Sequence, residues 1–163
     1  MRFNWLDYVL IGTVATVGAI QFLRSTKDFS RVLFETIFMV CAVAASSLLL
    51  RPLGKQTNLP APLLFGGVGA VLVVLGILLA ALFNRIMPFD MGIFNYLFGL
   101  LLAVICGYAL GHLALRTADM AISPRYPEFA AAVHHSLTAR DLLYFKTFIE
   151  VRAFLRFARW KGM

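Results

Sequence analysis

Polar and ionisable side chains inside long apolar stretches are the residues of this sequence best suited to chemistry. They are functional candidates in a membrane because burying them in hydrocarbon is costly. The set comprises Asp7, Glu35, Asn95 and His112. Asp7 and His112 are expected near the same membrane face, where they can pair. Glu35 follows Arg31 by four residues, which is the spacing of an ion pair on one helix face.

All of these side chains are predicted near the ends of their apolar stretches, with Asp7 and Glu35 at opposite membrane faces. The centres of the stretches offer only Thr, Ser and Cys as polar groups. A proton relay or an ion path needs polar carriers across the low-dielectric centre of a bilayer. We therefore expect these residues to be interfacial anchors, and a transport role is the less favoured alternative.

No sequence pattern typical of an enzyme accompanies them. His134 and His135 are adjacent, so they point to different faces of a helix, and no cysteine stands nearby to complete a zinc set. The sequence contains no Gly-x-Ser-x-Gly elbow, P-loop or dinucleotide fingerprint. Cys41 and Cys106 lie within apolar runs and are expected to be small buried side chains. The sequence predicts a non-enzymatic protein with no cofactor and no metal.

The composition indicates that lipid surrounds most of the chain. Of the 163 residues, 61% are hydrophobic and 14% are charged, against about 45–50% and about 25% in a typical soluble domain. Four stretches reach the roughly 20 apolar residues of a membrane-spanning helix, namely residues 5–23, 32–50, 63–83 and 93–115. Because the connections are short, sequential helices should be antiparallel neighbours. The expected fold is all-α, an integral-membrane four-helix bundle over residues 1–120.

The first apolar stretch has one alternative interpretation, a cleaved signal peptide, because Arg2 gives it a positively charged start. Asp7 at the front of the run and the lack of an Ala-x-Ala site favour a membrane span instead. We therefore expect the stretch to be the first helix of the bundle.

Small residues recur at helical spacing in three of the stretches, among them Gly12, Thr16 and Ala19 in the first and Gly66 and Gly69 in the third. Close backbone approach supplies much of the attraction between helices in lipid, and small residues permit it. The predicted helix-packing residues are Gly76 and Ala80 in the third stretch and Gly99, Ala103, Gly107 and Gly111 in the fourth. A pore or cavity lined by these residues is the less favoured alternative.

Residues 121–163 form a second unit, a basic tail rich in aromatic residues. Pro124 and Pro127 predict a break in the helical structure near the start of this unit. Thr138 and Asp141 have the spacing of an N-cap and its N3 residue, which predicts an amphipathic helix over residues 139–160. Its cationic and aromatic residues suit the lipid headgroup plane or a protein partner; they include Phe148, Arg152, Phe154, Arg156, Arg159 and Trp160. A solvated tail helix and single-strand nucleic-acid binding are less favoured.

The charge distribution indicates a lipid partner but leaves the orientation open. The net charge of +7 in so apolar a chain favours an anionic lipid surface over nucleic acid. Five Lys and Arg residues lie close to span ends on the side of both termini and four on the other side, too even a division for the positive-inside rule.

The opening Asn4-Trp5-Leu6-Asp7 resembles the start of the colicin V production protein family, small bacterial inner-membrane proteins with about four helices. That family has an Arg-Gly-Phe-x-Arg-Glu loop after its first helix and an Asp-Arg-x-x-Gly-x-x-x-Gly-x-x-x-Gly start to its last. Phe29 and Arg31 match the loop, whereas Asp28 and Val32 depart from it.

The fourth stretch keeps the glycine ladder of this family, but Asn95 and Tyr96 replace its charged pair. The resemblance covers roughly residues 3–120 and implies a multi-pass protein of the bacterial inner membrane, with loop 24–31 in the cytoplasm and both termini outside. It also implies a role in envelope homeostasis or peptide-toxin export, through protein partners or self-association. The rival hypothesis is a structural subunit of a larger membrane complex, such as an energy-converting assembly; a small carrier or channel is least favoured.

Overall fold

The computed structural model describes residues 4–57 and 59–144, and this part of the chain is helical with no strand. Four helices are long and apolar enough to cross a membrane. They are α1 (Trp5–Ser25), α2 (Phe29–Gln56), α3 (Ala61–Ile86) and α4 (Phe94–Ile122). The all-α four-helix bundle predicted from the sequence is confirmed, and the chain is a multi-pass membrane protein.

The helices are longer than the apolar stretches that predict them. Helix α2 continues through Pro52 to Gln56, and α4 continues seven residues past Leu115. At about 1.5 Å per residue, the 28 residues of α2 and the 29 of α4 extend about 42 and 44 Å. A hydrocarbon core is about 30 Å thick, so these two helices tilt or project beyond it.

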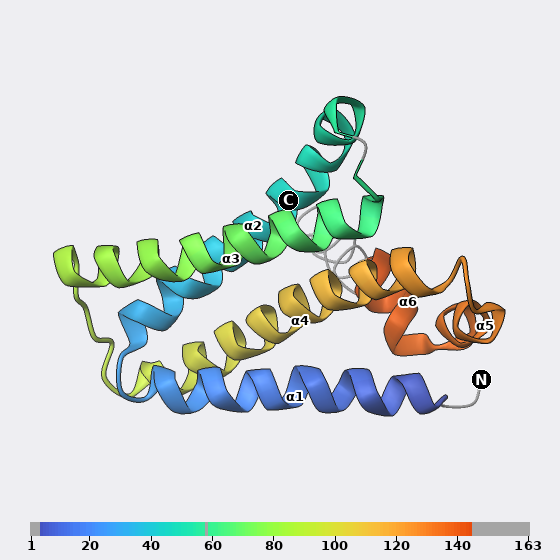
Figure 1. Ribbon diagram of the computed structural model, residues 1–163. Coiled ribbons are helices and arrows are strands. Elements are labelled where there is room, and N and C mark those ends of the chain that lie inside the picture. Colours follow the sequence, from blue (N-terminus) through green and yellow to red (C-terminus); the bar gives the residue numbers. More distant parts are fainter. Residues whose placement is uncertain (1–3, 58, 145–163) are drawn as a thin grey trace, which may run out of the picture.

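The long helices pack as two pairs, α1 with α4 and α2 with α3 (Figure 1). The expectation that sequential helices are neighbours therefore holds best for α2 and α3. Helix α1 lies mainly on α4 and touches α2 much less, and α4 contacts α2 more extensively than it contacts α3. Packing in lipid depends on close backbone approach rather than on chain order. Because small residues line the face of α4 that meets α1, α1 can approach α4 closely and packs more extensively on α4 than on α2.

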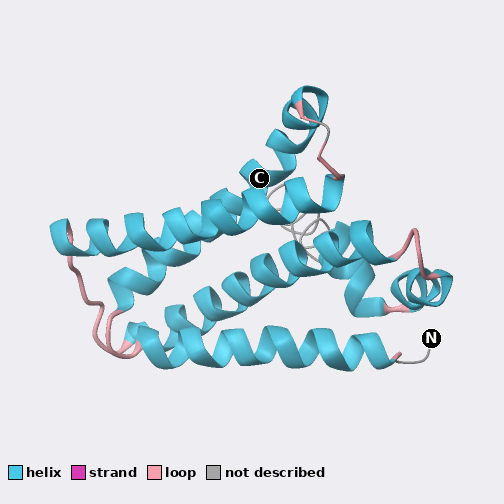
Figure 2. Ribbon diagram, viewed as in Figure 1, coloured by secondary structure: helices cyan, strands magenta, loops and turns pink. Residues whose placement is uncertain are grey.

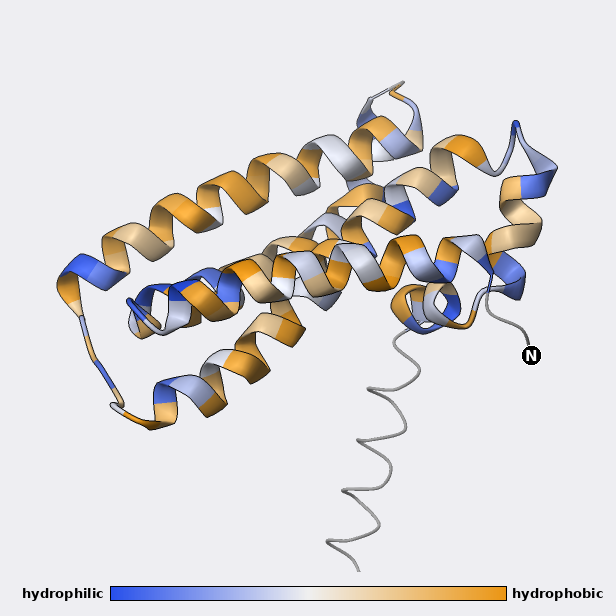
Figure 3. Cartoon of the chain, turned by 90° about the horizontal axis from the view of Figure 1, so that it is seen from below, coloured by the Kyte–Doolittle hydropathy of each residue, from blue (hydrophilic) through white to orange (hydrophobic). Residues whose placement is uncertain are grey.

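Hydrophobic residues predominate along the long helices (Figure 3). Large hydrophobic side chains are exposed on every long helix, for example Val9, Val40, Leu78 and Leu100. The loops lie at the two ends of the bundle (Figure 2). This distribution suits a protein whose flanks face lipid and whose ends face the headgroups and water.

Two short helices follow the predicted break, α5 (Pro127–His135) and α6 (Leu137–Tyr144). Helix α6 begins before the predicted Thr138 cap, because the Ser136 hydroxyl accepts from the Ala139 backbone N–H at 2.9 Å. The expected cap at Thr138 is therefore wrong. The remainder of the predicted tail helix lies outside the described residues, as do its candidate residues Phe148, Arg152, Phe154, Arg156, Arg159 and Trp160.

Candidate functional site

A buried carboxylate at the start of α1 forms hydrogen bonds with the start of α6. The Asp7 side chain is fully buried. Its Oδ1 accepts from the Ser136 hydroxyl at 2.7 Å and from the Thr138 backbone N–H at 2.8 Å, and its Oδ2 accepts from the Asn4 backbone N–H at 2.8 Å. We call these four residues the Asp7 cluster. It joins the first turn of α1 to the start of α6.

Further hydrogen bonds hold α5 and α6 against α1 and α4. The Nδ1–H of His112 donates to the Leu142 carbonyl at 2.6 Å. The Tyr108 hydroxyl donates to the backbone carbonyl of Asp141 at 2.5 Å and lies 3.0 Å from the side-chain Oδ2 of the same residue. The Asn4 amide donates to the backbone of α5 at 3.0 Å. Asp7 and His112, predicted as a possible pair, thus both bind the segment that follows Ser136.

An apolar core lies beneath these polar contacts. It combines residues from the start of α1, the end of α4 and both short helices, among them Leu6, Leu115, Val133 and Leu142. Figure 1 shows α5 and α6 at the end of the bundle where α1 begins and α4 ends. Helices α5 and α6 are therefore packed as part of the fold.

A second buried carboxylate lies at the opposite end of α1. Glu35 Oε1 accepts from Arg24 Nη2 at 2.7 Å and from Arg31 Nε at 3.1 Å, while Oε2 lies 3.4 Å from Gln21 Nε2. We call these residues the Glu35 cluster. The Arg31 pair follows from its spacing along α2. The Arg24 pair was not predicted, because it links two helices.

Gln21 of the Glu35 cluster also contacts a pair of buried sulfur atoms, those of Cys106 and Met39. Gln21 Nε2 lies 3.6 Å from Cys106 Sγ, which lies 3.2 Å from Met39 Sδ. Cys106 is buried as expected, but Cys41 is exposed, so the expectation of burial was wrong there. A residue in an apolar run can face lipid as readily as protein.

The described residues offer no metal site and no unsatisfied buried polar side chain. Over residues 4–57 and 59–144 no three His, Cys, Asp or Glu side chains gather to hold a metal ion. Every buried side-chain nitrogen or oxygen in this part of the chain has a hydrogen-bond partner. The buried polar groups are thus engaged in contacts within the protein, and their arrangement is that of structural anchors.

Asn95 shapes the turn that precedes α4. Its amide nitrogen donates to Asp90 Oδ1 at 2.6 Å, and its Oδ1 accepts from the Met91 backbone N–H at 3.1 Å. Gly92 donates its N–H to Asp90 at 2.8 Å and has a φ of 62°, which favours glycine. The Gly92 and Asn95 hydrogen bonds lower the pKa of Asp90.

The small residues of α4 lie against α1. A Cβ atom added to Gly107 would lie 2.8 Å from the Val14 carbonyl oxygen, and one added to Gly99 would lie 2.8 Å from Ser25 Cβ. One added to Gly111 would lie 3.2 Å from Val14 Cγ2, and Ala103 is buried. Larger side chains would hold the two helices apart.

The small residues of α3 lie against α2 in a similar way. A Cβ atom added to Gly76 would lie 3.0 Å from Phe38 Cβ, and Ala80 is fully buried. Each of the two helix pairs therefore has its own closely packed seam.

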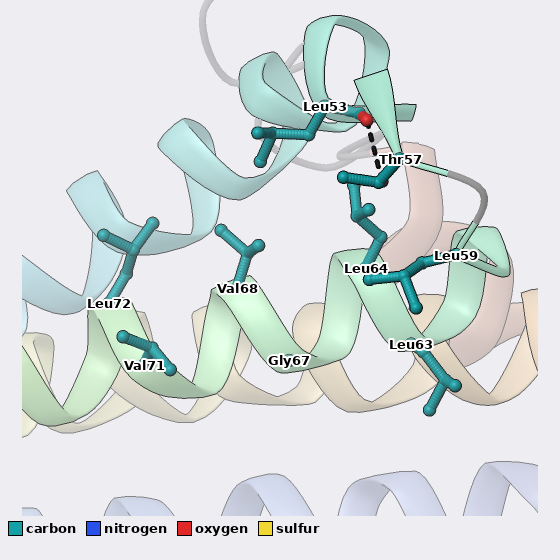
Figure 4. Close-up of a pocket in the computed structure, with 9 residues that line it drawn as sticks. All are labelled: Leu53, Thr57, Leu59, Leu63, Leu64, Gly67, Val68, Val71 and Leu72. Atoms are coloured by element: carbon teal, nitrogen blue, oxygen red, sulfur yellow. Dashed lines mark hydrogen bonds between the residues drawn. The ribbon is translucent and has the colours of Figure 1, made fainter. Parts of the chain in front are cut away.

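An apolar groove of about 420 Å³ opens between the end of α2 and the start of α3 (Figure 4). Leucine and valine side chains supply most of its lining, together with Gly67 and Thr57. The Thr57 hydroxyl donates to the Leu53 carbonyl at 2.8 Å. Among the described residues that line this groove, none has an acidic or basic side chain.

Comparison of the chain with protein-family models, with curated proteins and with solved structures gives no match. The functional argument therefore rests on the residues and contacts described above.

Proposed function

We propose that this chain is a non-enzymatic membrane protein that acts through protein partners and presents its C-terminal segment to them. The observation that carries the proposal is the Asp7 cluster, in which a buried carboxylate receives two hydrogen bonds from a segment about 130 residues further along the chain. A segment that served only as a solvated tail would not need such a fixed attachment.

The energetics of the Asp7 cluster favour a fixed position for α6. A buried carboxylate that loses its hydrogen bonds carries a desolvation penalty of about 1–3 kcal/mol or more. Undocking of α6 would remove both hydrogen bonds to Oδ1 and expose the apolar side of Leu142. Helix α6 is therefore held in one position against the start of α1.

The resemblance to the colicin V production protein family adds the biological setting to this proposal. Asp7 belongs to its opening motif and Arg31 to its loop motif, and the two lie in the two buried clusters. On that basis the protein acts in the bacterial inner membrane, in envelope homeostasis or peptide-toxin export. Its flanks contact membrane lipids, and its partners are other membrane proteins or a second copy of the chain.

The test is an Asp7→Asn substitution in the full-length protein. An asparagine at this position keeps one acceptor oxygen but places an NH2 donor where the other carboxylate oxygen accepts, and it removes the negative charge that strengthens all three hydrogen bonds. It cannot accept from all three donors, so α6 should undock while the bundle remains inserted. We expect partners captured by cross-linking in intact membranes to be lost from the variant. Protease sensitivity near residues 136–144 would report the undocking itself.

Asp119→Asn is the matched control. Asp119 lies near the same end of the bundle, and its side chain accepts from Ser123 on the next turn at 2.7 Å. It should keep the partners. Partner capture by Asp7→Asn at the wild-type level, with α6 undocked, would contradict the proposal. Native sizing after gentle extraction then separates a free small protein from the rival, a fixed subunit of a large complex.

A further inference from the structure

We infer that the Glu35 cluster binds a phosphate group, supplied by the headgroup of an anionic phospholipid, between Arg24 and Arg31. Both guanidinium groups contact one carboxylate oxygen, Glu35 Oε1, at 2.7 and 3.1 Å. Two positive charges therefore share one negative charge. The cluster holds one positive charge in excess at the end of a membrane-spanning helix.

In the described part of the chain, no acidic side chain other than Glu35 forms an ion pair with Arg24 or Arg31. Both ion pairs found over residues 4–57 and 59–144 end on Glu35. The nearest carboxylate along the sequence is Asp28, which accepts from the Arg31 backbone N–H at 3.3 Å and from the Asn84 amide at 3.1 Å. Lys27, which is exposed on the same connection, offsets the negative charge of Asp28, so the excess of one positive charge remains.

Exposure divides the cluster into an inner and an outer part. The Glu35 side chain is 0% exposed, whereas those of Arg24 and Arg31 are 40% and 41% exposed. A guanidinium has five N–H donors. Arg31 uses only its Nε in a side-chain hydrogen bond to the described residues. The carboxylate thus fixes the two arginines in place and leaves donors available at the surface.

The chemistry of the available donors fits a phosphate. Arginine binds phosphate oxygens through paired, charge-assisted hydrogen bonds, and anionic leaflets attract basic residues near span ends. Leu23 and Ile20, next to Arg24 on α1, are 64% and 54% exposed and face lipid. A phospholipid can therefore contact the arginines with its headgroup and the flank of α1 with its acyl chains, which inorganic phosphate cannot do.

The experiment measures binding of phosphatidylglycerol to the full-length protein in nanodiscs of phosphatidylcholine, with inorganic phosphate as a separate arm. In Arg31→Gln, Arg24 remains paired with Glu35 one to one, so the fold is kept while the charge excess is lost. We expect the affinity for phosphatidylglycerol to fall roughly ten-fold, the usual effect of losing a charge-assisted hydrogen bond. Arg85→Gln is the control, because it removes one exposed charge from the same end of the bundle and should leave the affinity unchanged.

Equal affinities for wild type, Arg31→Gln and Arg85→Gln would overturn the inference. Inorganic phosphate binding as tightly as phosphatidylglycerol would overturn the lipid source. A wild-type protein that shows no preference for phosphatidylglycerol over phosphatidylcholine at low salt would also overturn the inference. This measurement does not depend on whether any variant folds.

Discussion

The two ends of the bundle each bury one carboxylate, but they stabilise it in different ways. Asp7 accepts hydrogen bonds from a hydroxyl and two backbone N–H groups, and among residues 4–57 and 59–144 no cation forms an ion pair with it. Glu35 pairs with two arginines. Hydrogen bonds from neutral donors are directional and fix a segment in place. A cluster with surplus positive charge attracts anions from outside the protein.

The donors also differ in their distance along the chain. Ser136, a partner of Asp7, follows all four long helices in the sequence. The cationic partners of Glu35 lie in its own helix and in the preceding one. The Asp7 cluster therefore joins the first long helix to a segment that follows the last one, whereas the Glu35 cluster joins two consecutive helices.

The largest expected effect comes from breaking the seam between α4 and α1, the helix that contributes residues to both clusters. Gly107→Leu would force a bulky side chain against the Val14 carbonyl and separate α1 from α4. We expect a loss of stability of about 1–3 kcal/mol or more, as for other overpacked sites, measured by thermal unfolding in detergent. The expectation that Gly12 lies on a packing face is wrong, because Gly12 is exposed and a Cβ atom there meets no atom within 4 Å. Gly12→Leu is therefore the matched control. Equal stability of the two variants would show that the seam does not hold the ends together.

A smaller effect should distinguish the two clusters directly. Ser136→Ala removes a donor to a fully buried carboxylate and the cap of α6, so we expect a loss of about 1–2 kcal/mol. Arg24→Gln should cost less, about 0–1 kcal/mol, because Arg31 still pairs with Glu35 and Arg24 is partly exposed. Unfolding of both variants in the same detergent gives the comparison, and the reverse order would refute it.

The smallest effect concerns Asp90, a carboxylate of the α3–α4 loop outside both clusters. Because hydrogen bonds lower its pKa in the folded protein, its contribution to stability is present above its unfolded pKa. That contribution is lost as the pH falls through the folded pKa. Asn95→Ala removes one of these bonds and should raise the pKa of Asp90 towards its ordinary value. Carboxyl NMR titration measures this, and an unchanged pKa would show that the backbone hydrogen bonds from Gly92 and Met91 set the pKa of Asp90 without Asn95.

Sequence reasoning predicted features that depend on neighbouring residues. The four spans follow from apolar length, and the Arg31–Glu35 ion pair follows from a spacing of one helical turn. Asn4 and Asp7 also have the spacing of a capping box, a local signal that could have identified Asp7 as a cap. These features need no knowledge of which helices meet.

The contacts that the sequence did not reveal join distant segments. The Arg24–Glu35 pair and the Asp7–Ser136 hydrogen bond depend on how α1 packs against α2 and α6. The exposure of Cys41 depends on which side of α2 faces lipid. Apolar periodicity cannot separate a lipid-facing side from a buried side, because both are hydrophobic.

The unequal helix lengths link the two clusters to the thickness of the membrane. Helix α1 has 21 residues, or about 32 Å, so it matches a typical hydrocarbon core, whereas the longer α2 and α4 accommodate a thicker one by changing their tilt. Asp7 lies at one end of α1 and Arg24 at the other. A bilayer that thickens or thins therefore acts on both clusters at once, through the shortest of the four spans.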